Sequence, residues 1–177
     1  GKPHTCIYRV LPDYLAIGTD ADFVRIPMGS RTAQKVADLY GASLPTRRMV
    51  DQIWKASSVK LSPIPLPPGA IMMTNYYYGL HHQKVEAKRK PFPLGVLTAG
   101  HKKDVVISNR LLAWPARVAI YGWHWTTGKP IQPLSTVHEH AYADYSHGIR
   151  LVDATVLVDG VAKPLAEVLK SPVLHKL

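Results

Sequence analysis

A proline-rich stretch in the first half of the chain most constrains how it can fold. Residues 61–70 read LSPIPLPPGA, and five of these ten residues are proline or glycine. Proline has no amide hydrogen for a helix or a central strand, so this stretch must be an extended connector. We therefore expect one domain over residues 1–177, with an N-terminal part at 1–61, the connector at 62–70 and a longer part at 71–177, because neither part is large enough to stand alone.

The N-terminal part has the pattern of short strands followed by two helices. The stretches TCIYRVL and DFVRIPM are rich in branched and aromatic residues and predict strands. Ser30 is the expected N-cap of a helix over RTAQKVADLY, whose buried face comprises Ala33, Val36, Ala37 and Tyr40. Thr46 is the expected N-cap of a second helix over RRMVDQIWKA, with a buried stripe of Met49, Val50, Ile53 and Trp54.

The part after the connector has one more helix and then mainly strands. The pattern predicts a helix from Thr74 to about Lys88, strands in GVLTAG, DVVIS, RVAIYGWHW and IRLVDATVLVDG, a turn at Asp159–Gly160, and a last helix opened by Pro164. The predicted fold is α+β. It is a single domain with a mainly antiparallel β-sheet or sandwich in the C-terminal half and three or four short helices.

Charge narrows the class of partner. Lys and Arg outnumber Asp and Glu by 22 to 12, a net charge of +10, which favours anionic polymers such as nucleic acid, cell-wall polymer and acidic polysaccharide, or a membrane surface. The alternative is that the charge only keeps the protein soluble. A nucleic-acid partner is not expected, because the chain has no helix-turn-helix, zinc-finger or RNP pattern.

Two further features bear on location. No apolar run approaches the roughly 18 residues that cross a bilayer, so no transmembrane segment is expected. The single cysteine, Cys6, excludes a disulfide within the chain, which fits a secreted or periplasmic protein, our expectation, and also a cytoplasmic one. The sequence leaves the oligomeric state open.

The polar residues that carry chemistry gather between residues 101 and 150. The stretch AYADYSHGIRLV at 141–152 and the VHEH before it are the densest part. The expected catalytic residues are His124, His147, Asp144, Tyr121 and Tyr145. The expected substrate-binding residues are Arg150, Lys103, His101, Trp123 and Tyr142. This assignment requires that the fold bring the segments around 101, 124, 138 and 147 into one hollow that solvent reaches.

Three chemistries are compatible with these residues. In the first, His138 and His140 on one face of a strand hold zinc with Asp144, and the metal activates water. In the second, no metal is present: His147 or His124 is a general base that Asp144 orients, and Tyr121 or Tyr145 is the acid, for hydrolysis or for β-elimination on a uronic polymer. In the third, Ser146 is a nucleophile beside a base, although the G-x-S-x-G pattern is absent.

Two resemblances to known families rest on quoted residues. The stretches VLPDYLAIGTDADFVRIPM, GHKKDVVISNRL, RVAIYGWH and YADYSHGIRLV resemble an uncharacterised family of bacterial proteins expected to be exported, which implies no activity. The stretch SHGIRL is similar to the Ser-His-Gly-Cys signature of L,D-transpeptidases of the bacterial cell wall. The cysteine is missing, and Tyr121 in IYG stands in place of the histidine of the family's His-Gly pair. This resemblance implies a related cleft without the thiol chemistry.

Three functions follow, in this order. The first is an exported enzyme, a hydrolase or lyase, that acts on an anionic or cell-wall polymer through the His/Asp/Tyr/Arg cluster. The second is a non-catalytic module that binds such a polymer on Trp123, Trp125 and the tyrosines of NYYYG. The third is a nucleic-acid-binding protein that uses the basic surface.

Overall fold

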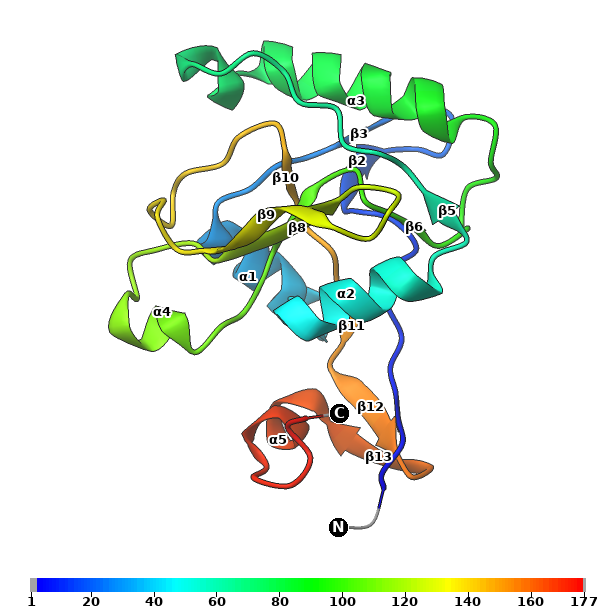
Figure 1. The fold of residues 1–177 in the computed structure, drawn as a ribbon, viewed down its shortest axis with the longest axis vertical. Coiled ribbons are helices and arrows are strands. Elements are labelled where there is room, and N and C mark those ends of the chain that lie inside the picture. Colours follow the sequence, from blue (N-terminus) through cyan, green and yellow to red (C-terminus); the bar gives the residue numbers. More distant parts are fainter. Residues whose placement is uncertain (1–2, 177) are drawn as a thin grey trace.

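The computed structural model describes residues 3–176, and it has an α+β fold with mostly antiparallel sheets, as predicted. Figure 1 shows a sheet at the centre with helices on both sides. This central sheet has the strand order β10-β7-β8-β9, with β7 at Lys103–Val105, β8 at Ile120–His124, β9 at Pro130–Ser135 and β10 at His147–Gly148. Strand β10 is parallel to β7, and the other two pairs are antiparallel.

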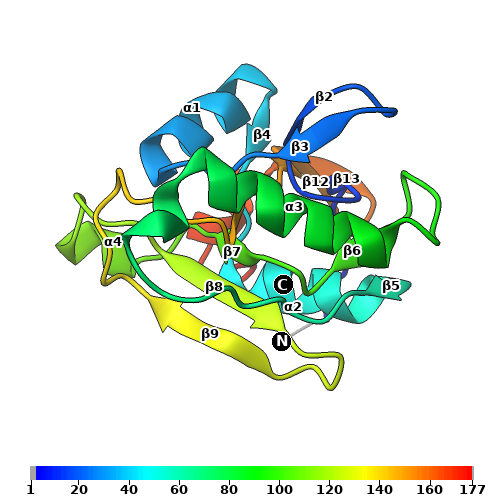
Figure 2. The ribbon, with the colours of Figure 1, turned by 90° about the horizontal axis from the view of Figure 1, so that it is seen from above.

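Two helices cover the central sheet. Helix α3 (Asn75–Arg89) lies above it and helix α2 (Arg47–Ala56) lies below it (Figures 1 and 2). The other helices are α1 (Ser30–Leu39), the one-turn α4 (Arg110–Ala113), α5 (Leu165–Lys170) and a 3-10 turn, η1 (Ala70–Met73). The sequence predicted α1, α2, α3 and α5; α4 is too short for a helical periodicity to be visible.

The helix starts test the capping predictions. The Thr46 side chain accepts a hydrogen bond from the backbone of α2, as predicted. Thr74, expected as the first residue of α3, is its N-cap and accepts a backbone hydrogen bond in the same way. The prediction for α1 is wrong: Ser30 is its first helical residue and Gly29 is the N-cap. Tyr40 is also not on a buried face, because it follows the last turn of α1 and is 72% exposed. Pro164 ends a strand and is the N-cap of α5 rather than its first residue.

Small sheets join the two ends of the chain. Strand β1 (Cys6–Ile7) pairs with β12 (Thr155–Val158), which forms a hairpin with β13 (Val161–Pro164). Strand β4 (Ala42–Ser43) pairs with β11 (Val152–Asp153), and β5 (Val59–Lys60) pairs with β6 (Thr98–Ala99). Strands β2 (Ala16–Gly18) and β3 (Phe23–Arg25) form a hairpin of their own. The parts before and after the connector therefore share sheets.

The connector and the hairpin turn have the predicted character. Residues 61–68 contain no helix or strand. Asp159 and Gly160, between β12 and β13, have φ of 51° and 82°, the left-handed backbone that a two-residue hairpin turn of type I′ requires at both positions. No helix within residues 3–176 is long and apolar enough to span a membrane.

The core leaves no room for a side chain at Gly148 in β10. A Cβ atom at this position would lie 2.5 Å from Cδ1 of Tyr14 and 2.7 Å from Cβ of Lys102. Tyr14 and Lys102 are both buried, so neither can move aside easily. The parallel β10–β7 pairing therefore depends on a residue without a side chain at 148.

We predict opposite effects on stability from two Gly→Ala substitutions. Gly148→Ala overpacks the core and should lower the free energy of unfolding by about 1–3 kcal/mol. Gly79→Ala, inside α3 where no atom lies within 4 Å of the new Cβ, should raise it by about 0.5–1 kcal/mol. Urea unfolding of both variants measures this; equal effects would contradict the packing at Gly148.

Candidate active site

The predicted site residues fall into separate groups, so the expected single hollow does not form. His101, His124 and His147 are all buried, and each has a different carboxylate as its neighbour: Asp13, Asp51 and Asp144. The predicted residues also lie on opposite faces of the central sheet. Trp123 and Tyr145 pack with Tyr77 of α3, whereas Tyr121 packs with Val50 of α2.

Five of the predicted residues lie around a sixth, Asp144. We call these six residues, together with Ser146, the Asp144 group. The Tyr142 hydroxyl donates to Asp144 Oδ2 at 3.0 Å, and the Ser146 backbone and hydroxyl donate to Oδ1. His147 Nε2 lies 4.0 Å from Oδ2. The group comprises Asp144, Tyr142, Tyr145, His147, Lys103, His138 and Ser146.

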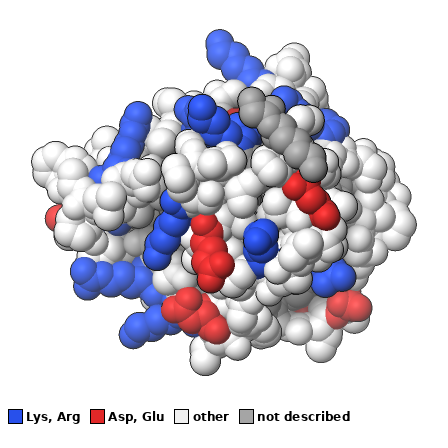
Figure 3. Space-filling model, turned by 90° about the horizontal axis from the view of Figure 1, so that it is seen from below, with Lys and Arg blue, Asp and Glu red and all other residues white. Residues whose placement is uncertain are grey.

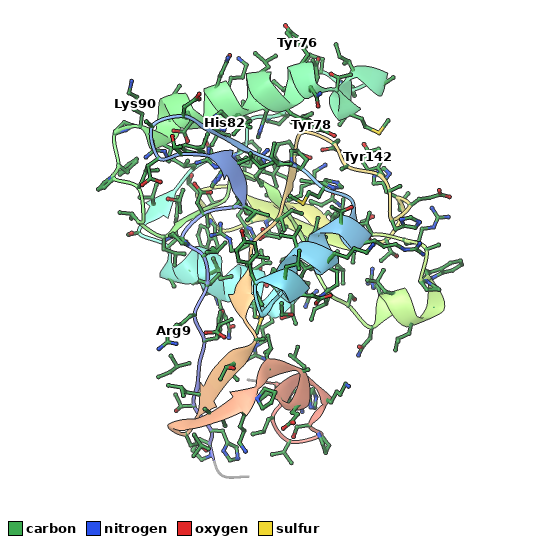
Figure 4. All side chains as sticks on the ribbon, turned by 180° about the vertical axis from the view of Figure 1, so that it is seen from behind. Arg9, Tyr76, Tyr78, His82, Lys90 and Tyr142 are labelled. Atoms are coloured by element: carbon green, nitrogen blue, oxygen red, sulfur yellow. The ribbon has the colours of Figure 1, made fainter. Side chains whose placement is uncertain are left out.

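The outer members of the Asp144 group are aromatic rings and a lysine. The ring of His138 stacks on that of Tyr142 with centroids 3.9 Å apart, and Lys103 Nζ lies 5.1 Å from the centre of the Trp123 ring. Figure 4 shows Tyr78 on the inner side of α3, next to the loop that carries Tyr142. The Tyr78 hydroxyl donates to the Ala143 carbonyl at 2.6 Å, which fastens this loop to α3.

The reactive atoms of the Asp144 group are closed to solvent. Asp144, Ser146 and His147 are buried, and both ring nitrogens of His147 lack a hydrogen-bond partner. Ser146 is therefore not paired with a base, as a serine nucleophile would require. The Tyr145 hydroxyl accepts a hydrogen bond from the Leu66 N–H in the connector at 2.7 Å and donates one to the Leu66 carbonyl at 3.2 Å. This arrangement holds the loop in place.

His101 and Arg150 also lie inside the fold. His101 Nε2 bonds to Asp13 at 3.0 Å, and Asp13 is paired with the buried Arg25. The Arg150 guanidinium donates to the carbonyls of Leu11 and Thr98 at 2.9 and 2.7 Å. Arg150 was expected to bind a substrate carboxylate from the surface; it is fully buried and its two terminal nitrogens are bound to backbone.

The remaining predicted residues, Tyr121 and His124, meet on the α2 side of the sheet. The Tyr121 hydroxyl donates to Asp51 Oδ1 at 2.8 Å, and His124 Nε2 bonds to the same oxygen at 3.1 Å. The Asp51 side chain is 37% exposed, so solvent reaches its carboxylate, whereas Tyr121 and His124 are buried. We call Asp51, Tyr121 and His124 the Asp51 group.

A bulge in β8 creates the Asp51 group. Residues three apart on a regular strand point to opposite faces, so alternation predicts that Tyr121 and His124 are separated. The pairing of β8 with β9 shifts register between Ile120 and Gly122, and Gly122 and Trp123 have φ of 107° and 57°. The irregular backbone brings Tyr121 and His124 to the same carboxylate and sends Trp123 to the other face.

One further ring and two cations lie around the Asp51 group. Trp54 stacks on His124 with centroids 5.8 Å apart, and Lys60 Nζ lies 5.0 Å from the centre of the Trp54 ring. The Arg47 guanidinium lies 5.7 Å from the centre of the Tyr121 ring. Trp123, predicted as a binding surface, is buried, whereas Trp125 at the end of β8 is 43% exposed.

The protonation states of the Asp51 group suit a base and an acid. Burial lowers the pKa of His124 below its ordinary 6.5, and the hydrogen bond and charge of Asp51 oppose this only in part. Burial raises the pKa of Tyr121 to about 12, and Asp51 adds to the rise. At neutral pH His124 is thus neutral with Nε2–H donating to Asp51, and Tyr121 keeps its proton.

The free nitrogen of His124 is not completely sealed, although the side chain is only 3% exposed. Nδ1 has no hydrogen-bond partner within residues 3–176, and it is not among the unpartnered polar atoms completely shut off from solvent, unlike both nitrogens of His81 and His147. A Cβ at position 122 would lie 3.4 Å from Nδ1, so glycine leaves this edge of the ring uncovered by a side chain. An unprotonated nitrogen that no other group occupies is what a general base requires.

No sequence pattern marked Asp51, Arg47 or Trp54 as a site residue. All three lie on the α2 helix, about 70 residues before Tyr121. Arg47 and Asp51 are one turn apart, and Trp54 is three residues further, so they share one side of the helix. The available signal was a single acidic residue in an otherwise basic helix, RRMVDQIWKA.

The residues predicted to bind zinc do not form a metal-binding set. His138 and His140 lie in a turn rather than on a strand, so their rings are not held on one face. The His138 ring is stacked on Tyr142. Over residues 3–176, no three His, Cys, Asp or Glu side chains are grouped so that they could hold a metal ion.

Comparisons with known proteins do not extend this description. No protein-family model, no curated protein and no solved structure matches the chain.

The buried histidines predict how stability depends on pH. Burial lowers the pKa of His101 and His147 to about 4 each and that of His81 to about 2, from 6.5. Below pH 6.5 the unfolded chain therefore binds more protons, and each histidine should lower the free energy of unfolding by up to about 1.4 kcal/mol per pH unit as pH falls toward 4. Burial raises the pKa of Asp104 to about 6, which offsets one histidine in the same range.

We therefore expect urea unfolding to show a fall in stability from pH 6.5 to 4 with a slope of at least about two groups, because the lowered pKa values of His82 and His124 act in the same direction. His147→Gln should remove about one group from this slope, whereas His175→Gln, on an exposed side chain, should not change it. A slope that His147→Gln leaves unchanged would contradict the burial of a neutral His147.

Proposed function

We propose that the protein is an enzyme that performs acid–base chemistry on an anionic polymer, with the Asp51 group as its reacting groups. The observation that carries this is one carboxylate, Asp51, that holds both a neutral histidine and a protonated tyrosine at 3.1 and 2.8 Å. In this pair His124 has a nitrogen without a hydrogen-bond partner, and Tyr121 has a proton to give. Base and acid are then fixed together on one carboxylate that solvent reaches.

The step that this set fits is β-elimination from a uronate-containing polysaccharide. His124 Nδ1 takes the proton on the carbon next to the uronate carboxylate. The electron pair left on that carbon forms a carbon–carbon double bond, and the bond to the glycosidic oxygen at the β carbon breaks. Tyr121 donates its proton to that leaving oxygen, and Asp51 stabilises the imidazolium that forms.

Hydrolysis of a glycosidic bond fits less well. Glycosidases of the common kind use two carboxyl groups on opposite sides of the bond. Within the part of the chain that the structure describes, Asp51 is the one carboxylate bonded to Tyr121 or His124. Because neither the base, His124, nor the acid, Tyr121, is a carboxyl group, the set favours elimination over hydrolysis.

The charges near the Asp51 group favour an anionic substrate. Arg47 and Arg48 are exposed one turn before Asp51, and Lys55 is exposed one turn after it. Arg47 lies over the Tyr121 ring, so its guanidinium is placed beside the acid. A guanidinium here neutralises the substrate carboxylate and makes the neighbouring carbon more acidic.

The first test is turnover on uronate polymers and on peptidoglycan, followed by the ultraviolet absorbance of the new double bond and by reducing ends. Asp51→Asn, Tyr121→Phe and His124→Gln should each lower turnover by about 10²–10⁴-fold, because each removes an acid–base partner. Asp38→Asn, an exposed carboxylate on α1, should have no effect.

Folding must be controlled in this test. Circular dichroism and urea unfolding identify variants that have lost structure rather than chemistry. Full turnover in folded His124→Gln, or loss of turnover in folded Asp144→Asn while Asp51→Asn stays active, would overturn the assignment and return the reaction to the Asp144 group.

The second test is the pH profile. Activity should fall only below pH 6.5, as His124 gains a proton, because its pKa is lowered. It should not fall on the alkaline side until near pH 12, where Tyr121 loses its proton. A profile that declines between pH 8 and 10 in folded protein would argue against Tyr121 as the acid.

A second candidate function is a polysaccharide-binding module, and the exposed Trp125 favours it. In that case Trp125→Ala abolishes binding of the polymer, and no turnover is found for any preparation. For an enzyme, Asp51→Asn should keep polymer binding while it loses turnover.

A further inference from the structure

The 3-10 turn η1 and the start of α3 form an exposed apolar knob. Ile71, Met73 and Tyr76 are 43%, 50% and 67% exposed, although they are among the larger apolar side chains of the protein. Figure 4 shows Tyr76 pointing outward above α3, whereas Tyr78 and His82 lie on its inner side. We call Ile71, Met73 and Tyr76 the knob.

The exposed side of α3 continues from the knob to Lys90. Tyr76, Gln83, Ala87 and Lys90 are spaced by 7, 4 and 3 residues, which places them along one side of the helix, and Lys84 lies beside this row. Lys84 and Lys90 are exposed, and Figure 4 shows Lys90 at the far end of the helix from Tyr76. The helix is about 22 Å long, so the knob and Lys90 bound a wide, shallow surface.

This surface has little negative charge. The chain has no acidic residue between Asp51 and Glu86. Glu86 itself is neutralised, because its carboxylate is bonded to Arg25 at 2.7 Å and to Arg89 at 2.8 Å. The exposed acids Asp20 and Asp22 belong to the turn of the β2–β3 hairpin.

The opposite side of the molecule carries charges of both signs. Figure 3 shows the lower face, on which acidic side chains stand among the basic ones. The α3 face combines exposed lysines with exposed apolar side chains.

We propose that the α3 face docks on an anionic lipid bilayer, with the knob inserted at the level of the headgroups and Lys84 and Lys90 over the anionic lipids. Lysines near such a surface each add about 1 kcal/mol of attraction, and apolar and tyrosine side chains partition into its interface. A polyanion such as nucleic acid explains the lysines but not the knob. The proposal is independent of the Asp51 group, which lies on the α2 side of the sheet.

The test is co-sedimentation of the full chain with vesicles of phosphatidylglycerol and phosphatidylcholine, and with vesicles of phosphatidylcholine alone, at several salt concentrations. We expect binding to the anionic vesicles that weakens as salt is raised. Lys84→Glu/Lys90→Glu should weaken binding by at least about 30-fold, from about 1 kcal/mol for each lysine. Ile71→Ser/Met73→Ser should weaken it as well, because it removes the inserted side chains.

Two variants away from this face are matched controls. Lys35→Glu/Lys170→Glu reverses two exposed lysines on α1 and α5, and Leu39→Ser removes an apolar side chain that is more exposed than any in the knob. Both should bind as the unchanged protein does. The proposal is overturned if no anionic vesicle binding occurs, if the controls lose as much as the α3 variants, or if Ile71→Ser/Met73→Ser binds unchanged while heparin competes fully, which would identify a polyanion site.

Discussion

A buried guanidinium holds the fold together. Arg150 lies under the ring of Tyr14, with the guanidinium carbon 4.2 Å from the ring centre, and it donates to carbonyls of Leu11 and Thr98. Its nearest carboxylate, Asp104, is 3.8 Å away. A buried charge is costly unless its hydrogen bonds are made. The N-terminal segment, β6 and β7 must therefore keep the positions in which they contact Arg150. The position of β7 then sets that of β8, and with it the Asp51 group.

The central sheet divides the polar residues into two groups of different character. The α3 side holds the Asp144 group, whose bonds fasten a loop and whose reactive atoms are sealed. The α2 side holds the Asp51 group, in which a partly exposed carboxylate joins two buried side chains. Gly122 and Trp123 decide this division, because their left-handed backbone breaks the alternation of β8. The exposure of Asp51, compared with the buried Asp144, is what distinguishes the candidate active site.

Local signals predicted much of the fold. Thr46 caps the helix that it was expected to cap, and Asp159–Gly160 forms the expected turn, because both depend on neighbours in the sequence. Strand β9 was not predicted, since Pro130 and Pro133 argue against a strand; both are tolerated because β9 is at the sheet edge. The site was predicted only in part. Tyr121 and His124 were identified, but burial of Arg150 and His147, the bulge, and the contact with Asp51 depend on tertiary packing that the sequence does not display.

Whether His124 is a neutral base held by Asp51 is best decided by ¹⁵N NMR of its imidazole in the folded protein at neutral pH. We expect a neutral ring with the proton on Nε2, where it donates to Asp51, and a bare Nδ1. We also expect that Asp51→Asn disturbs this arrangement. A charged imidazolium at neutral pH, or a proton on Nδ1, would contradict it.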